Sequence, residues 1–114
     1  MLITENIEDI TVLSFQNISK FNVSNADPIK EKIGSIYNTP NAKVVLDLSG
    51  IEFIDSTGFG VFLSIMKTAN NNYGFFKICN VSERVMELFK LLQLHNVFEI
   101  YKTREDALKS SELI

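Results

Sequence analysis

The residues with the clearest capacity for chemistry lie together at positions 55–60, where the chain reads Asp-Ser-Thr-Gly-Phe-Gly. This segment joins an apolar run to a helical pattern, and the first turn of a helix leaves backbone N–H groups without partners. Asp55 or Ser56 could cap these groups, because both side chains accept hydrogen bonds. Ser56 and Thr57 also bring two hydroxyl groups to a place that a second molecule can reach.

Two glycines follow these hydroxyl groups, at Gly58 and Gly60. A glycine inside a helix costs up to about 1 kcal/mol relative to alanine, so a pair of them needs a reason. One reason is the close approach of a second molecule to the backbone, with Phe59 expected to protrude between them as an apolar contact. On spacing alone, a capped helix with a loosened first turn is the plainer interpretation.

Three other residues lack the neighbours that chemistry requires. His95 is the one histidine and falls in a predicted turn, and with a single cysteine no metal-binding cluster is evident. Cys79 ends an apolar run, which favours a buried small hydrophobe. Asp47 stands near a strand end like the phosphoacceptor of a receiver domain, but the paired acids of such a site are missing, so a turn residue is favoured. We therefore predict neither an enzyme nor a metal or cofactor site.

Length and composition fit one globular domain. The 114 residues carry a net charge of -3, with 46% apolar and 22% charged residues, and a single domain is expected over 1–114. Acids and bases are interspersed, whereas a nucleic-acid-binding protein needs a clustered basic face. No run approaches the roughly 20 apolar residues of a membrane span, and no signal peptide is visible. We therefore expect a cytoplasmic protein.

Apolar patterning predicts alternating strands and helices after a leading hairpin. β-branched and aromatic runs predict strands at 2–7, 10–15, 43–48, 75–79 and 97–101. Helices are expected after caps at Asn25 or Asp27, Asp55 or Ser56, Ser82 and Thr103. Gly74 is predicted to end the second helix in a left-handed conformation, and residues 17–25 stay unassigned. The order predicts an α/β fold: a mixed four- to five-stranded sheet with an N-terminal hairpin and about four helices packed against it.

A family resemblance is carried by residues 44–60, which read Val-Val-Leu-Asp-Leu-Ser-Gly-Ile-Glu-Phe-Ile-Asp-Ser-Thr-Gly-Phe-Gly. This resembles the signature of STAS-domain anti-sigma factor antagonists: an apolar strand with Asp, a turn, then Phe-[Ile/Met]-Asp-Ser-[Ser/Thr]-Gly-[Leu/Phe]-Gly. The segments 80–85, 94–100 and 103–108 also resemble the C-terminal half of the family. The resemblance covers nearly the whole chain and implies the STAS fold.

What the resemblance implies is a partner-switching cycle in bacteria. The unphosphorylated protein would bind an anti-sigma factor with serine kinase activity and thereby free a sigma factor. The kinase would phosphorylate Ser56, with Thr57 as the second candidate, and a metal-dependent Ser/Thr phosphatase would reverse the modification. The alternative keeps the STAS fold but makes the protein a scaffold or accessory subunit of a signalling or membrane-transport assembly. A monomer or weak dimer is expected.

The resemblance also assigns a partner-binding surface. It comprises one residue before the first helix and most of the 55–60 segment, namely Asn22, Asp55, Thr57, Gly58, Phe59 and Gly60. Asn22 stands where many family members carry an acid, in a segment that reads Ser-Lys-Phe-Asn in place of the usual Gly-x-[Leu/Ile]-Asp.

Overall fold

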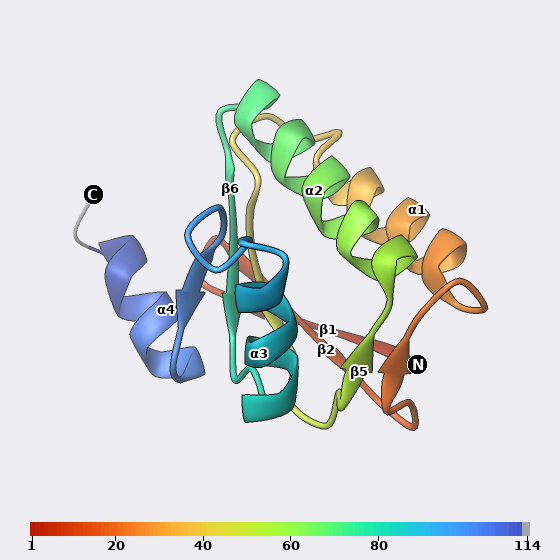
Figure 1. Ribbon diagram of the computed structural model, residues 1–114. Coiled ribbons are helices and arrows are strands. Elements are labelled where there is room, and N and C mark those ends of the chain that lie inside the picture. Colours follow the sequence, from red (N-terminus) through yellow and green to blue (C-terminus); the bar gives the residue numbers. More distant parts are fainter. Residues whose placement is uncertain (113–114) are drawn as a thin grey trace.

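The computed structural model describes residues 1–112 as a mixed sheet with helices on both faces (Figure 1). The predicted α/β fold, with four helices and a five-stranded sheet, is confirmed. The elements in chain order are β1 (Leu2–Ile7), β2 (Ile10–Phe15), β3 (Lys20–Phe21), α1 (Ala26–Ile36), β4 (Lys43–Asp47), β5 (Phe53–Ile54), α2 (Ser56–Asn71), β6 (Phe75–Cys79), α3 (Glu83–Leu91), β7 (Glu99–Tyr101) and α4 (Arg104–Glu112). The predicted strands at 43–48 and 97–101 are therefore somewhat shorter in the structure.

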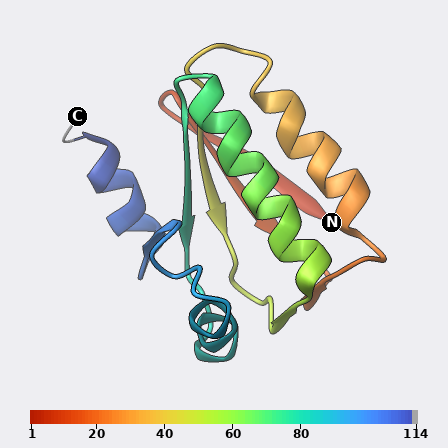
Figure 2. The same ribbon diagram turned by 45° about the horizontal axis from the view of Figure 1, so that its top comes forward.

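The main sheet has the strand order β1-β2-β4-β6-β7. β1 and β2 form the predicted antiparallel hairpin, and all other neighbouring strands are parallel. β4 lies in the middle because its apolar run is covered on both faces, as parallel strands require. Figures 1 and 2 show α1 and α2 side by side on one face of the sheet and α4 on the opposite face.

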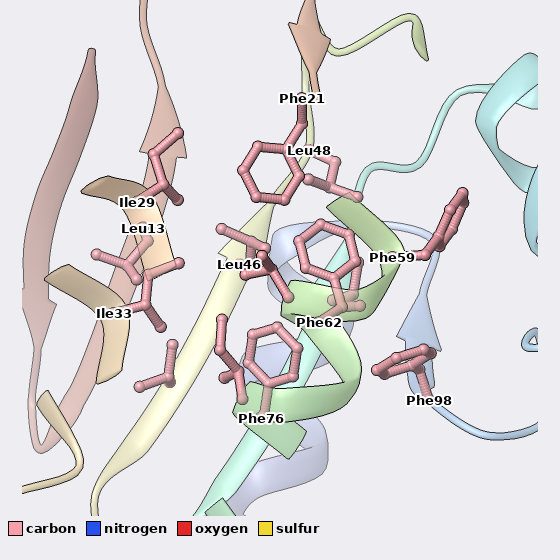
Figure 3. Packing of buried hydrophobic residues seen from close by; sticks show 14 of the residues in the cluster. Leu13, Phe21, Ile29, Ile33, Leu46, Leu48, Phe59, Phe62, Phe76 and Phe98 are labelled. Carbon is pink, nitrogen blue, oxygen red and sulfur yellow. The ribbon is translucent and has the colours of Figure 1, made fainter. Parts of the chain in front are cut away.

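A cluster of aromatic rings forms the centre of the larger core, between the sheet and helices α1 to α3. Phe62 of α2 is fully buried there, and Figure 3 shows it between the central strands and the α3 side of the fold. Four rings surround it, with centroid distances of 5.2 Å to Phe21, 6.4 Å to Phe59, 6.2 Å to Phe76 and 6.4 Å to Phe98. These rings come from β3, α2, β6 and the segment before β7, so Phe62 packs against rings from several distant parts of the chain.

A smaller apolar cluster lies under α4 on the other face of the sheet. It comprises Ile10, Val12, Val45, Cys79 and Ala107. α4 begins at the cap predicted from the sequence, because the Asp106 backbone N–H donates to Thr103 Oγ1 at 3.0 Å. The predicted cap at Ser82 is confirmed in the same way, since Ser82 Oγ accepts from the Val85 backbone N–H at 3.1 Å.

The segment left unassigned, 17–25, contains a short strand that the sequence pattern does not reveal. β3 pairs in parallel with β5, with Lys20 opposite Phe53 and Phe21 opposite Ile54. Strands of two residues are too short to show a period, which is why they escape sequence reasoning. This small sheet positions the start of α2, because β5 leads directly to Asp55, whose backbone N–H donates to the Phe21 carbonyl at 3.2 Å.

Of the two caps predicted for α1, Asn25 occupies the N-cap position, but its side chain makes no capping hydrogen bond, and Asp27 lies inside the first turn. Instead Asn25 Oδ1 accepts from the Asn22 backbone N–H at 3.0 Å. The side chain therefore serves the turn before the helix.

The end of α2 also differs from the prediction. The left-handed residue is Tyr73, with φ of 63°, and the prediction that Gly74 adopts this conformation is wrong. Gly74 is needed for a different reason, because a Cβ atom there would overlap the carbonyl oxygen of Ala42.

Candidate functional site

Asp55 caps α2 and also binds a second segment of the chain. Its Oδ1 accepts from the Gly58 backbone N–H at 2.9 Å, and its Oδ2 accepts from the Val23 backbone N–H at 3.1 Å. Of the two caps that the sequence leaves open, the structure selects Asp55. Ser56 is consequently free of the capping role, and it is exposed as the first residue of α2.

The outward face of α2 begins with the Ser56 hydroxyl. Ser56, Gly60, Leu63 and Lys67 are all exposed, and their spacings of four, three and four residues place them on one side of the helix. A Cβ atom at Gly60 would meet no other atom within 4 Å. Gly60 therefore leaves the helix backbone open to solvent one turn beyond the hydroxyl, and Leu63, with 38% of its surface exposed, follows as an apolar contact.

Phe59 and Gly58 point into the protein, contrary to what the sequence suggested. Only 3% of Phe59 is exposed, and its ring packs edge-on against Phe89 at a centroid distance of 4.9 Å. The prediction that Phe59 protrudes is therefore wrong. Gly58 is buried as well, and a Cβ atom there would lie 2.8 Å from the Phe21 carbonyl oxygen and 2.7 Å from Cγ2 of Ile54. Gly58 makes room for β3 and β5, not for a partner.

The Asn22 side chain shapes the turn before α1. Its Oδ1 accepts from both the backbone N–H and the hydroxyl of Ser24, at 3.0 Å and 2.6 Å. The next residue, Val23, is held by Asp55 and has 72% of its surface exposed. The structure thus brings this turn to the start of α2, as the resemblance implies, but Val23 is its most prominent side chain.

We call the residues exposed around the hydroxyl the Ser56 surface: Val23, Ser56, Thr57, Gly60 and Leu63. Sequence reasoning found Ser56, Thr57 and Gly60 but missed the other two. Leu63 could have been found, because it lies seven residues after Ser56, two helical turns along the same face. Val23 could not, since it is brought here by long-range contacts, namely the pairing of β3 with β5 and the hydrogen bond to Asp55.

The remaining candidates offer no second site. Within residues 1–112, no three His, Cys, Asp or Glu side chains are grouped to hold a metal ion. Cys79 is fully buried, and burial, followed by the nearby Asp47 carboxylate, raises the pKa of its thiol to about 12. The reactive thiolate is therefore scarce at neutral pH. Among the helices of the described part, none has the length and apolar character needed to cross a bilayer.

Asp47 anchors α4 to the end of β4. Its Oδ2 accepts from Arg104 Nη2 at 3.0 Å and from Nε at 3.2 Å, and its Oδ1 accepts from the Ser49 hydroxyl at 2.6 Å. Only 4% of the surface of Asp47 is exposed. The sequence predicts Asp47 as a turn residue, and this is only part of its role. The ion pair with Arg104 joins residues 57 positions apart, which local sequence signals do not reveal.

The ionisation of Asp47 is expected to make stability depend on pH. Burial raises the pKa of Asp47, but hydrogen bonds from Ser49, Asn80 and Arg104 outweigh it, so the pKa lies below the usual value. A lowered pKa in the folded state stabilises the protein above the unfolded-state pKa of about 3.9, and this contribution disappears as the pH falls through the folded-state value. Asp47→Asn should therefore lower the free energy of unfolding by about 1–3 kcal/mol at pH 7.

Urea unfolding of wild type and Asp47→Asn at several pH values tests this. The stability difference should be constant between pH 5 and 8 and should shrink below about pH 4. Glu105→Gln on the exposed side of α4 is a matched control without a buried partner. A difference that stayed constant down to pH 2 would contradict the assignment to this carboxylate.

Comparison with known proteins places these features in a family. The family model described as "STAS domain" matches residues 1–107. The anti-sigma-B factor antagonist of Bacillus subtilis is 30% identical over 99 residues, which cover 86% of each chain. A solved anti-sigma-factor antagonist (STAS) domain protein from Planctomyces limnophilus is 22% identical and superposes with a TM-score of 0.88 over 96% of both chains.

A further structural neighbour is the anti-sigma factor antagonist SpoIIAA of Bacillus. Its unphosphorylated form is 18% identical and superposes with a TM-score of 0.74 over the full length of both chains. SpoIIAA has also been solved in a phosphorylated form, which superposes with a TM-score of 0.70 over 97% of this chain and 99% of that one. The family match over most of the chain, together with these relatives, shows that the protein belongs to the STAS domain family, whose members include anti-sigma factor antagonists.

Proposed function

We propose that this protein is an anti-sigma factor antagonist whose Ser56 surface binds an anti-sigma factor with serine kinase activity. Binding would free a sigma factor in the bacterial cytoplasm, and phosphorylation of Ser56 would end it. The observation that carries the proposal is the exposed Ser56 hydroxyl at the start of α2, on the same helix face as the bare backbone of Gly60. The relatives named anti-sigma factor antagonist support the proposal. The role is one of binding rather than catalysis.

The physical effect of phosphorylation follows from the position of Asp55. A phosphate adds about -1.5 to -2 charges at pH 7, directly beside a carboxylate. It also adds bulk and bound water next to Gly60, where a partner could otherwise approach the helix backbone closely. Because Asp55 and not Ser56 accepts the capping hydrogen bond from Gly58, the cap survives the modification. Phosphorylation should therefore weaken partner binding while leaving the fold intact.

Helix geometry favours Ser56 over Thr57 as the phosphate acceptor. Both side chains are exposed, but successive helical residues are rotated by about 100°. Ser56 therefore shares a face with Gly60 and Leu63, whereas Thr57 points to the flank. A metal-dependent Ser/Thr phosphatase would restore the hydroxyl.

The test compares Ser56→Asp with Thr57→Asp, using the anti-sigma kinase encoded in the same genome and isothermal titration calorimetry. We expect Ser56→Asp to weaken binding about tenfold or more and to change the free energy of unfolding by less than about 0.5 kcal/mol. Thr57→Asp should have a smaller effect on binding.

Two controls separate the outcomes. Ser56→Ala should retain binding but block phosphorylation, as judged by mass spectrometry after incubation with the kinase and ATP. If Ser56→Asp binds like wild type, or loses its fold together with its binding, the proposed switch is wrong. A scaffold, which needs no acceptor hydroxyl, would then be the better description.

A further inference from the structure

β1 forms an open edge of the main sheet. Within residues 1–112, β1 pairs only with β2, and no strand lies on its outer side. Its four central residues, 3–6, are all exposed. Proteins commonly block such edges with charged side chains, proline or a bulge. This strand reads Leu-Ile-Thr-Glu-Asn-Ile, and of these devices it has only the single charge of Glu5. The opposite edge, β7, is only three residues long.

The hydrogen-bond pattern identifies which groups of β1 face outward. The Gln16 backbone N–H donates to the Met1 carbonyl at 2.6 Å, so Met1 and Gln16 form a hydrogen-bonded pair of the ladder. In an antiparallel ladder, bonded and non-bonded pairs alternate. The backbone groups of Ile3, Glu5 and Ile7 therefore point toward β2. Those of Leu2, Thr4 and Asn6 point away from it, toward solvent.

We propose that β1 pairs with β1 of a second copy of this chain, antiparallel and about a two-fold axis at Thr4. Outward-facing groups must meet one another, and this register uses all three outward residues. Thr4 then lies opposite Thr4 of the second copy, and Leu2 lies opposite Asn6 of the second copy. The two five-stranded sheets join into one.

The avoidance of like charges favours this register over the next one toward the hairpin turn. In the proposed register the exposed side chain of Ile3 lies opposite Glu5 of the second copy, and no like charges meet. A shift by one bonding position toward the hairpin turn would place Glu5 opposite Glu5, which is unfavourable. Glu5 also pairs with Arg104 of its own chain, at 3.2 Å, so its charge is partly balanced in the dimer.

The dimer should be weak and compatible with partner binding. A strand of six residues spans only about 20 Å, and stable interfaces usually bury more than about 1,000 Å². We therefore expect a dissociation constant on the order of 0.1–1 mM. The Ser56 surface lies on α2 and on the turn before α1, so no residue of β1 takes part in both contacts.

Opposite charges at Ile3 test the register. Ile3→Glu places like charges at two symmetric positions of the interface, whereas Ile3→Lys places opposite charges there. Because opposite charges across a strand pair attract and like charges repel, sedimentation equilibrium should show a several-fold weaker dimer for Ile3→Glu and an equal or tighter dimer for Ile3→Lys. If both substitutions weaken association equally, the contact is merely apolar and the register is wrong.

A proline at the two-fold axis tests the backbone pairing. Thr4→Pro removes an N–H group that points outward, so it leaves the bonds between β1 and β2 in place. The variant should keep its circular dichroism spectrum and become monomeric, while Thr4→Ala should dimerise like wild type. A wild-type protein that stays monomeric at about 1 mM, or a folded Thr4→Pro that still dimerises, overturns the proposal. If Thr4→Pro fails to fold, the two Ile3 variants decide.

Discussion

Replacing Phe62 by alanine is expected to lower the free energy of unfolding by about 3–5 kcal/mol. Phe62 is fully buried, and rings from β3, α2, β6 and the segment before β7 surround it. Loss of the ring leaves a cavity that these elements cannot close, because β3 is held in the small sheet with β5 and β6 is held in the main sheet. Since a domain of this size is stable by only about 5–15 kcal/mol, the variant should lose a large fraction of its stability.

The neighbouring residue supplies a matched control for this prediction. Leu63 is on the same helix but has 38% of its surface exposed, so Leu63→Ala should cost less than about 1 kcal/mol. Urea unfolding followed by circular dichroism measures both variants. Similar losses for the two substitutions would mean that the aromatic cluster is not the centre of the core.

Replacing the two glycines of the 55–60 segment by alanine is expected to change the stability of the protein in opposite directions. At Gly58 the new Cβ would lie 2.8 Å from the Phe21 carbonyl oxygen, which belongs to the backbone and cannot move easily. Gly58→Ala should therefore destabilise the protein by about 1–3 kcal/mol. At Gly60 there is open space, so Gly60→Ala should stabilise α2 by up to about 1 kcal/mol.

Gly60→Ala is also expected to change partner binding. If a partner contacts the bare backbone at Gly60, then Gly60→Ala should weaken its binding although the protein becomes more stable. Thermal unfolding, and calorimetric titration with the proposed anti-sigma kinase partner, measure both effects on the same samples. A Gly60→Ala variant that is stabler and binds equally well would remove Gly60 from the interface. Leu63→Ala tests the next turn of the same face.

The sequence pattern predicted the main strands, the four helices and the cap position at 55 or 56, because each rests on local signals. β4 shows a near-continuous apolar run, and Ser82 and Thr103 each stand just before a helical stripe. Features that depend on distant segments could not be seen in this way. The parallel pairing of β3 with β5 and the ion pair of Asp47 with Arg104 join segments that are far apart in the chain.

The wrong prediction for Phe59 has a different origin, because the information was local. Phe59 lies three residues before Phe62 and six before Ile65, so it belongs to the buried stripe of α2. The two flanking glycines are typical of a loop, although the segment is helical. The helical period of α2 places Phe59 and Gly58 on the buried side, and Ser56 and Gly60 on the exposed side.

Both oxygens of the Asp55 carboxylate stabilise the fold. One binds the start of α2 and the other binds the turn at Val23, so the acid is required for the shape of the domain whether or not any partner exists. The neighbouring Ser56 hydroxyl does not cap α2, so the fold does not depend on it. A single change at position 56 would therefore remove the proposed switch and leave the domain intact, whereas a change at position 55 would disturb the fold as well.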